Sequence, residues 1–150
     1  MSDKSRPSAE AAVSELLSIM ARLRDPDGGC PWDLKQDFDS IVPYTVEEAF
    51  EVAEAVARRD YPELKEELGD LLLQVVFHSQ MAREQGLFDF SEVVAVLNDK
   101  MVRRHPHVFG DRTAEDEQAV KVNWEAIKAE ERARKGREYD SALDLSLIHI

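Results

Sequence analysis

Two short acidic motifs hold the residues of this chain whose types and spacing best suit chemistry. Glu47, Glu48 and Glu51 lie in the first motif, and Glu67 and Asp70 lie in the second. Because helical residues three positions apart share one face, each motif can present two carboxylates side by side. Mg²⁺ takes oxygen ligands and keeps open positions for phosphate and water. The two motifs therefore suggest a site for a divalent cation.

The position of these carboxylates relative to the predicted core supports a metal site. At about 100° per residue, Glu48 projects between Val52 and Ala55, on the face expected to be buried. Glu67 lies beside the apolar stripe of the next helix, and Asp70 lies at the edge of that stripe. Carboxylates near a core are costly unless they are paired or bind a metal. The stripe consists of Leu64, Leu68, Leu71 and Val75.

The ligand types indicate which metal would bind. No histidine follows any of these glutamates by three positions, so the Glu-x-x-His signature of di-iron bundles is missing. All-oxygen ligation favours Mg²⁺, with Mn²⁺ as a substitute, over zinc or iron.

The same carboxylates also have a purely structural explanation. Thr45 and Glu48 fit the capping box of a helix start, and Glu67 and Asp70 fit a solvated helix edge. Gly69 favours the metal site slightly, because glycine inside a helix costs about 1 kcal/mol relative to alanine. Close packing of another helix or a ligand would explain a glycine there. Spacing alone leaves both explanations open.

The elements that would position these residues are predicted to be helices, in an all-α fold. Hydrophobic residues recur with a helical period almost throughout, and no segment alternates apolar and polar residues for long. Thr45 and Asp60 favour helix starts, and Gly86 favours a helix end. We expect five helices, at 8–24, 46–59, 62–85, 91–104 and 114–135, with a loop at 25–43. Short connections between the second, third and fourth predict an antiparallel helical bundle.

The chain is long enough for one domain with a hydrophobic core, and its two ends differ from the middle. We expect a flexible N-terminus at 1–12 and the domain at 13–136. Residues 137–150 are expected to be the start of an interdomain linker or a truncated tail. The apolar ending from Leu145 to Ile150 lacks caps and has the character of a fragment end.

The acidic composition limits the classes of partner. The net charge is −12, and duplex nucleic acid or an anionic membrane would be repelled by such a surface. Cys30 is the single cysteine, so no intrachain disulfide can form. No secretory signal is evident, and no apolar run approaches the ~20 residues of a membrane span. These features predict a cytoplasmic protein that binds neither nucleic acid nor membrane.

One basic cluster stands out in this acidic chain. Lys100, Arg103 and Arg104 are followed closely by His105 and His107. The cluster can bind phosphates and stabilise charge on a leaving group. It can also simply complement the dipole at a helix C-terminus, which taken alone is the favoured explanation. The sequence has no Gly-x-x-x-x-Gly-Lys-Ser/Thr loop, which disfavours a P-loop NTPase.

Two tryptophans are candidate contacts for a nucleobase. Trp32 lies in the Gly/Pro-rich loop, and Trp124 lies in the last predicted helix. Each ring can stack on a base or pack at an end of the bundle, and the sequence leaves both explanations open.

Taken together, the motifs resemble those of the MazG family of all-α pyrophosphohydrolases, in particular its N-terminal domain. Glu47-Glu48-x-x-Glu51 followed by Glu67-x-x-Asp70 is similar to the EExxE…ExxD signature of that family. The resemblance extends in order over about residues 13 to 144. Its other segments are Cys30-Pro-Trp-Asp33, Pro43-Tyr-Thr-Val-Glu-Glu48, Glu66-Glu-Leu-Gly-Asp-Leu-Leu72 and Arg103-Arg-His-Pro-His-Val-Phe109.

The resemblance implies an activity and a set of site residues. The reaction would be hydrolysis of an NTP or dNTP to the monophosphate and diphosphate by a metal-activated water, with Glu47 or Glu51 helping to deprotonate that water. It also implies a homodimer with nucleotide near the interface. The implied Mg²⁺ ligands are Glu48, Glu51, Glu67 and Asp70. The resemblance also favours the basic cluster as the phosphate contact, with Lys100 and Arg104 preferred over Arg103, and it implies that Trp124 and Lys128 contact the nucleotide.

Two other functions compete with this one. Full MazG proteins resemble two such domains in tandem, so this chain can instead be a catalytically weak scaffold that binds nucleotide or dimerises. It can also be a sister enzyme acting on dUTP, dCTP or phosphoribosyl-ATP. Assays of turnover and of a substrate panel separate these alternatives.

Overall fold

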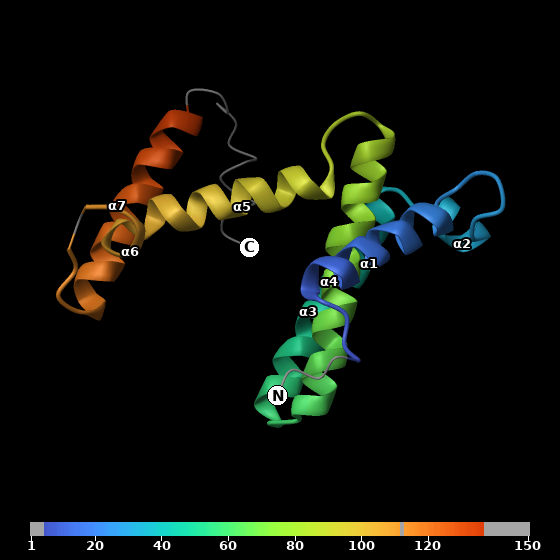
Figure 1. Cartoon of the computed structure of the whole chain (residues 1–150), viewed down its shortest axis with the longest axis horizontal. Coiled ribbons are helices and arrows are strands. Elements are labelled where there is room, and N and C mark those ends of the chain that lie inside the picture. Colours follow the sequence, from blue (N-terminus) through green and yellow to red (C-terminus); the bar gives the residue numbers. More distant parts are fainter. Residues whose placement is uncertain (1–4, 112, 137–150) are drawn as a thin grey trace. The chain divides into compact units, whose positions relative to one another are not determined.

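A computed structural model describes residues 5–111 and 113–136, which form seven α-helices and no β-strand (Figure 1). The predicted all-α class is therefore confirmed. Part of the expected flexible N-terminus, residues 1–4, and the expected linker or tail at 137–150 lie outside the described residues. The helices are α1 (Ala9–Leu23), α2 (Pro31–Leu34), α3 (Phe38–Ala57), α4 (Tyr61–Glu84), α5 (Phe90–Arg104), α6 (Pro106–Phe109) and α7 (Glu117–Lys135).

The five predicted helices correspond to α1, α3, α4, α5 and α7, and local capping fixes several of their ends as expected. The Asp60 carboxylate accepts from the backbone N–H of Glu63 at 3.1 Å and starts α4. Gly86 ends α4 with a φ of 70°. The N–H of Leu87 donates to the Ala82 carbonyl at 2.9 Å, which completes a Schellman motif.

The predicted start of the second helix was wrong. Helix α3 begins at Phe38, because Asp37 and Ser40 form a capping box, with the Ser40 N–H donating to Asp37 at 2.8 Å. Pro43 therefore lies inside the helix, where it lacks only one N–H donor. Thr45 does not cap the helix, and its hydroxyl donates to the Ile41 carbonyl instead.

Two short helices and one later start also differ from the prediction. Helix α2 lies inside the segment predicted to be the loop at 25–43, and helix α6 follows α5 directly. Each has proline near its first position, where the missing N–H costs nothing. Helix α7 begins at Glu117 rather than just after Thr113, because the Asp116 carboxylate caps the N–H of Ala119 at 2.8 Å.

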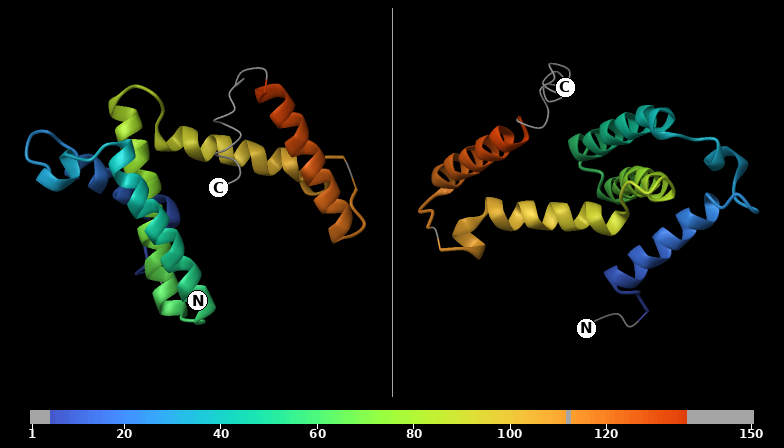
Figure 2. Two further views of the ribbon diagram at one scale, coloured as in Figure 1. Left: turned by 180° about the vertical axis from the view of Figure 1, so that it is seen from behind. Right: turned by 90° about the horizontal axis from the view of Figure 1, so that it is seen from above.

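The chain forms two compact units, the first ending at Val93 and the second beginning at Val94. In the first unit, α3 and α4 lie antiparallel along each other, as the two views in Figure 2 also show, and α1 packs on α4. The core lies where these three helices meet, and each fully buried large apolar side chain contributes roughly 1.5–3 kcal/mol. Its buried members are Met20, Ile41, Val76, Phe77 and Met81, with Leu16, Leu17, Phe38, Leu73 and Phe90 packed around them.

The predicted apolar stripe of α4 is only partly buried. Leu68 is 49% exposed and Val75 is 39% exposed, because α1 and α3 cover the face that carries Val76, Phe77 and Met81 instead. On α3, Phe50 is 71% exposed. The α3–α4 pair thus leaves apolar side chains uncovered in a single chain.

Within residues 5–111 and 113–136, no helix has both the length and the apolar character needed to cross a membrane.

Candidate functional site

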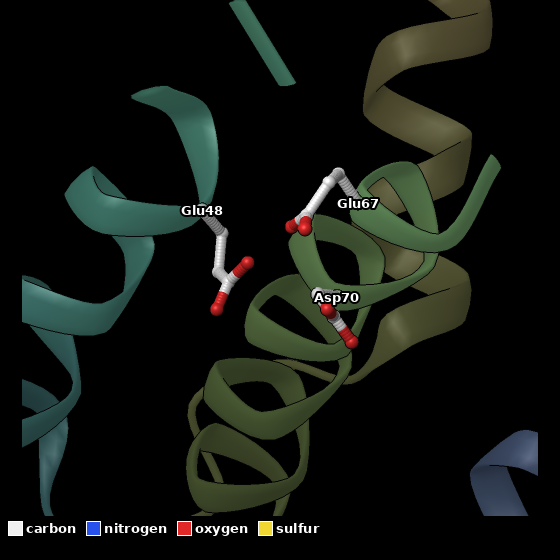
Figure 3. Close-up of side chains that lie close together, drawn as sticks. All are labelled: Glu48, Glu67 and Asp70. Carbon is white, nitrogen blue, oxygen red and sulfur yellow. The ribbon is translucent and has the colours of Figure 1, made fainter. Parts of the chain in front are cut away.

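Three carboxylates from the α3–α4 pair converge in the first unit. Figure 3 shows Glu48 of α3 facing Glu67 and Asp70 of α4. One oxygen from each residue lies within 4.8 Å of the others. Glu67 is only 9% exposed, whereas Glu48 is half-buried and Asp70 is exposed. We refer to these three residues as the acidic triad.

The spacing of the triad is close to that of ligands on one cation. Mg²⁺ holds oxygens at 2.0–2.1 Å, so two oxygens on the same ion are at most about 4.2 Å apart. The ligand oxygens of the acidic triad all lie within 4.8 Å of one another, which is compatible with three ligands that converge on one ion. The arrangement arises because the two residues on α4 are three positions apart and α3 runs antiparallel beside them.

The pKa values of Glu67 and of Glu63, which lies one turn earlier on α4, are both raised. A hydrogen bond from Glu63 lowers the pKa of Glu67, but burial, a hydrogen bond with Glu48 and the negative charges of Glu48 and Glu51 outweigh it and raise this pKa. The pKa of Glu63 is raised by its hydrogen bond to Glu67, by burial and by nearby carboxylates. None of the ion pairs among the described residues reaches the triad. The triad therefore carries negative charge that no side chain of residues 5–111 and 113–136 offsets through an ion pair.

The other predicted acidic residues lie near the triad without joining it. Glu51 is half-buried and acts on Glu67 through its charge, and Glu47 is exposed. Sequence reasoning did not single out Glu63, although its position four residues before Glu67 would have placed it on the same helix face. Glu51 and Glu63 line one hollow, together with Glu54, Ala55, Arg58 and Asp60.

The predicted basic residues lie on α5 in the second unit. The Nη1 of Arg103 donates to Oε1 of Glu131 at 2.5 Å, and the Nη2 of Arg104 donates to Oε2 of Glu131 at 2.6 Å. The Nε of Arg103 also donates to Asp99 at 2.8 Å. Lys100 is half-buried and forms no ion pair among the described residues. Helix α7 thus supplies a carboxylate to two of the three predicted phosphate ligands.

These arginines stabilise the charged form of Glu131. Its pKa is lowered by the hydrogen bond from Arg104 and then by that from Arg103, against the opposing effect of burial. The pKa of Arg103 is raised by its hydrogen bonds to Asp99 and Glu131. Sequence reasoning missed Glu131, because a partner 27 residues away becomes a neighbour only through tertiary packing.

Trp124 packs within the same cluster. Its ring lies edge-on to His105, with centroids 4.9 Å apart, and the guanidinium carbon of Arg104 lies 5.3 Å from its centroid. Such contacts stabilise a cation next to an aromatic face. Lys128, on the next turn of α7, pairs with Glu125 at 3.2 Å.

Trp32 lies on α2 in the first unit and is 49% exposed. Its ring makes an edge contact with Tyr44, at a centroid distance of 5.7 Å. Arg24 fixes this segment by donating to the carbonyls of Asp33 at 2.6 Å and Gln36 at 3.0 Å, and it pairs with Glu84. An exposed aromatic ring on an anchored segment remains available for stacking.

The fold and the triad together define an all-α protein with a carboxylate cluster on paired helices. Residues 36–109 match the MazG nucleotide pyrophosphohydrolase domain, a range that contains both acidic motifs and the basic residues of α5. The chain belongs to the MazG family. The resemblance inferred from the motifs is therefore confirmed.

Two curated relatives show how similar the sequences are and how much of each chain the similarity covers. Over 132 residues the chain is 56% identical to a nucleoside triphosphate pyrophosphohydrolase of Escherichia coli (strain K12), covering 88% of this chain and 49% of the relative. It is 50% identical over 121 residues to the nucleoside triphosphate pyrophosphohydrolase/pyrophosphatase MazG of Thermotoga maritima, covering 81% of this chain and 46% of that one. The chain spans about half the length of these curated relatives.

A solved structure supports the fold. The crystal structure of a mazG-related protein from Thermotoga maritima matches with a TM-score of 0.63 at 27% sequence identity. The match covers 77% of this chain and 98% of that chain.

Proposed function

We propose that this chain is a Mg²⁺-dependent nucleoside triphosphate pyrophosphohydrolase, which converts an NTP and water to the monophosphate and diphosphate. The names of its relatives support the activity. The observation that carries the proposal is the acidic triad, whose three oxygens lie within 4.8 Å of one another. Because no basic side chain in the described part of the chain pairs with it, a hard cation with free positions for phosphate is the natural complement.

The ligands fit Mg²⁺ by their chemistry. Glu48, Glu67 and Asp70 supply oxygens only, which suits Mg²⁺ and, as a substitute, Mn²⁺. Glu51 lies close enough to raise the pKa of Glu67, and we propose it as the fourth ligand. When bound, the ion polarises the phosphates and lowers the pKa of a coordinated water.

Proton transfer falls to a carboxylate beside the triad. In the proposed reaction, the water oxygen bonds to the α-phosphorus and the bond to the α–β bridging oxygen breaks, so that diphosphate leaves. Glu51 or Glu47 accepts the proton of the water, since both lie within four residues of Glu48 on α3. Of the two, Glu51 is half-buried, and its negative charge contributes to the raised pKa of Glu67.

The basic residues of α5 and the tryptophans are proposed to bind the nucleotide. Lys100, Arg103 and Arg104 would contact the phosphates, because guanidinium groups match phosphate oxygens in geometry and charge. The remaining proposed contacts, for the nucleoside part, are Trp32, Trp124 and Lys128.

We also propose that the chain is a homodimer. A helix pair that exposes apolar residues over two neighbouring surfaces is costly in water unless a partner covers it, and isologous contacts between two copies are the commonest solution. The uncovered apolar residues are Val42, Val46 and Phe50 on α3 and Leu68, Leu72 and Val75 on α4. A cytoplasmic location, and the lack of nucleic-acid or membrane partners, stay predictions from composition.

The alternative is a catalytically weak domain that binds nucleotide or dimerises. It is favoured by the length of the chain, which spans about half of its curated relatives, and by the arginines of α5, whose charges are already paired with Glu131. In that case the rest of a longer protein would supply most of the turnover.

Turnover of mixed NTPs with Mg²⁺ separates the two functions. The chain would be compared with Glu48→Ala and Glu67→Ala, and with Glu15→Ala as a control of equal charge change on the exposed face of α1. We expect diphosphate release that requires Mg²⁺ and falls about 100-fold or more in both triad variants, with the control unchanged. An equal, metal-independent rate in all four proteins would establish the scaffold instead.

A substrate panel then tests the class of nucleotide. ATP, GTP, CTP and UTP would be compared with their deoxy forms and with phosphoribosyl-ATP. A strong preference for dUTP, dCTP or phosphoribosyl-ATP would place the chain with the sister enzymes rather than with a general NTP hydrolase.

A further inference from the structure

Glu131 of α7 bridges two arginines of α5 with a single carboxylate. Each carboxylate oxygen accepts from a different guanidinium group, Oε1 from Arg103 at 2.5 Å and Oε2 from Arg104 at 2.6 Å. The Glu131 side chain is only 14% exposed, and that of Arg104 is 17% exposed. A carboxylate that divides its oxygens in this way fixes the separation of the two guanidinium groups.

The bridge leaves most arginine donors available. A guanidinium group has five N–H donors in a planar fork. Arg104 gives one Nη to Glu131, and its Nε is buried and has no partner among the described residues. Arg103 gives one Nη to Glu131 and its Nε to Asp99. Apart from the buried Nε of Arg104, the remaining Nη–H groups of the two arginines can donate to phosphate oxygens without breaking the contact with Glu131.

The ring of Trp124 limits the freedom of Arg104 from another side. Arg104 lies over this ring at 5.3 Å from its centroid, so its guanidinium group is held by a carboxylate and by an aromatic face. Orientation that is fixed before binding reduces the entropy lost when a ligand is bound.

We propose that Glu131 is a positioning residue, which holds Arg103 and Arg104 as one fixed pair that binds the polyphosphate of the nucleotide. The proposal rests on the proposed function, since it takes these arginines as phosphate ligands. It goes beyond that function by assigning a role to an acidic residue on a separate helix.

A purely structural role for Glu131 would be to tie α7 to α5. Removal of the bridge would then lower thermal stability and leave the affinity for phosphate unchanged in the folded protein. A counter-ion that merely competes with phosphate would act in the opposite direction, since its removal would strengthen binding. The positioning role predicts weaker binding, with kcat largely retained.

The test compares the full chain with Glu131→Ala, Glu131→Gln and the control Glu117→Ala. Glu117 forms a solvent-exposed pair with Lys121 on the same helix, so it matches the loss of charge without touching the arginines. KM and kcat for ATP would be measured with Mg²⁺, and binding of inorganic tripolyphosphate would be measured by calorimetry. Thermal unfolding by circular dichroism would confirm that each variant is folded at the assay temperature.

We expect Glu131→Ala to raise KM, and to weaken tripolyphosphate binding, about tenfold, with kcat within about twofold of the wild type. The KM and the tripolyphosphate affinity of Glu131→Gln should lie between those of the wild type and Glu131→Ala, because the amide oxygen can still accept from one arginine. Glu117→Ala should match the wild type.

An unchanged or lower KM in a folded Glu131→Ala protein would overturn the positioning role, while the hydrolase would stand. If the wild type shows no turnover, the proposed hydrolysis fails by itself. Tripolyphosphate binding then decides the role of Glu131, which is supported by weaker binding in Glu131→Ala and overturned by equal binding.

Discussion

Charge is balanced differently in two regions of the molecule. One is the acidic triad of α3 and α4, and the other is the arginine cluster, which consists of Arg103 and Arg104 of α5 and Glu131 of α7. In the triad, carboxylates face one another, no cationic side chain among the residues that the structure describes pairs with them, and the pKa of Glu67 is raised. In the arginine cluster, Glu131 lies between two cations and its own pKa is lowered. The first region is complete only with an added cation, whereas the second is already neutralised in part. Unmet charge therefore marks the triad as the better candidate for the metal.

The two regions should also respond oppositely to pH. Carboxyl groups with raised pKa bind more protons in the folded state, so their contribution to stability falls as pH rises from 4.5 through the raised pKa. A carboxyl group with lowered pKa behaves in the reverse sense. Glu131 contributes stability above about pH 4.5 and loses it as pH falls through its folded-state pKa.

The largest effect is expected from Glu67→Gln, which removes a triad charge with little change in shape. Turnover of NTP should fall about 10²–10³-fold, the usual range for loss of one group that stabilises a transition state. In metal-free buffer at neutral pH, the melting temperature should rise, because repulsion from Glu48 and Glu51 is relieved. Steady-state kinetics and thermal unfolding measure the two effects.

The control for this variant is Glu15→Gln on α1, which makes the same charge change at an exposed position of the first unit. It should leave both turnover and melting temperature close to the wild type. A Glu67→Gln protein that melts lower than the wild type without metal would show that Glu67 is a structural residue and that its charge is already compensated.

Removal of Mg²⁺ should have the next largest effect. An ion at 100 times its Kd stabilises the folded state by about 2.7 kcal/mol. The gain should be larger at pH 8 than at pH 5, because a proton on Glu67, whose pKa is raised, competes with the ion for the same oxygens. The stabilisation by Mg²⁺ is measured as the difference between melting temperatures with Mg²⁺ and with EDTA at both values of pH. An equal difference in the Glu67→Gln protein would show that the ion binds elsewhere.

The arginine cluster should respond to acid instead. Glu131→Gln is expected to lower the free energy of unfolding at pH 7 by about 1 to 2 kcal/mol, the size of charge-assisted hydrogen bonds after screening by solvent. The difference from the wild type should shrink below pH 4.5, as the wild-type carboxylate itself takes up a proton. Urea unfolding at pH 7, 4 and 3 would show this. A constant difference over that range would mean that the ionised form of Glu131 contributes nothing.

Local rules predicted much of the fold and the acidic part of the site. Asp60 and Gly86 marked both ends of α4, because a cap and a left-handed glycine act through neighbouring residues only. The three-residue spacing of Glu67 and Asp70, added to an antiparallel neighbour, was enough to bring Glu48 to them.

The features that the sequence did not reveal depend on competition or on tertiary packing. The loop was predicted to extend to Pro43, but the capping box of Asp37 and Ser40 starts the helix earlier and outweighs the loss of one N–H at the proline. Glu131 reaches the arginines only because α7 folds back on α5. No spacing rule links residues so far apart.

The smallest effect concerns Gly69, next to the triad on α4. Close packing was one explanation for this glycine, yet a Cβ built there meets nothing within 4 Å in the single chain. Gly69→Ala should therefore stabilise the monomer by about 1 kcal/mol through helix propensity alone. If a second copy packs across α4, the added methyl group would meet it and weaken association instead. Unfolding at low and high protein concentration separates these results: a gain at both leaves Gly69 uncovered, and a gain lost at high concentration places the partner beside the triad.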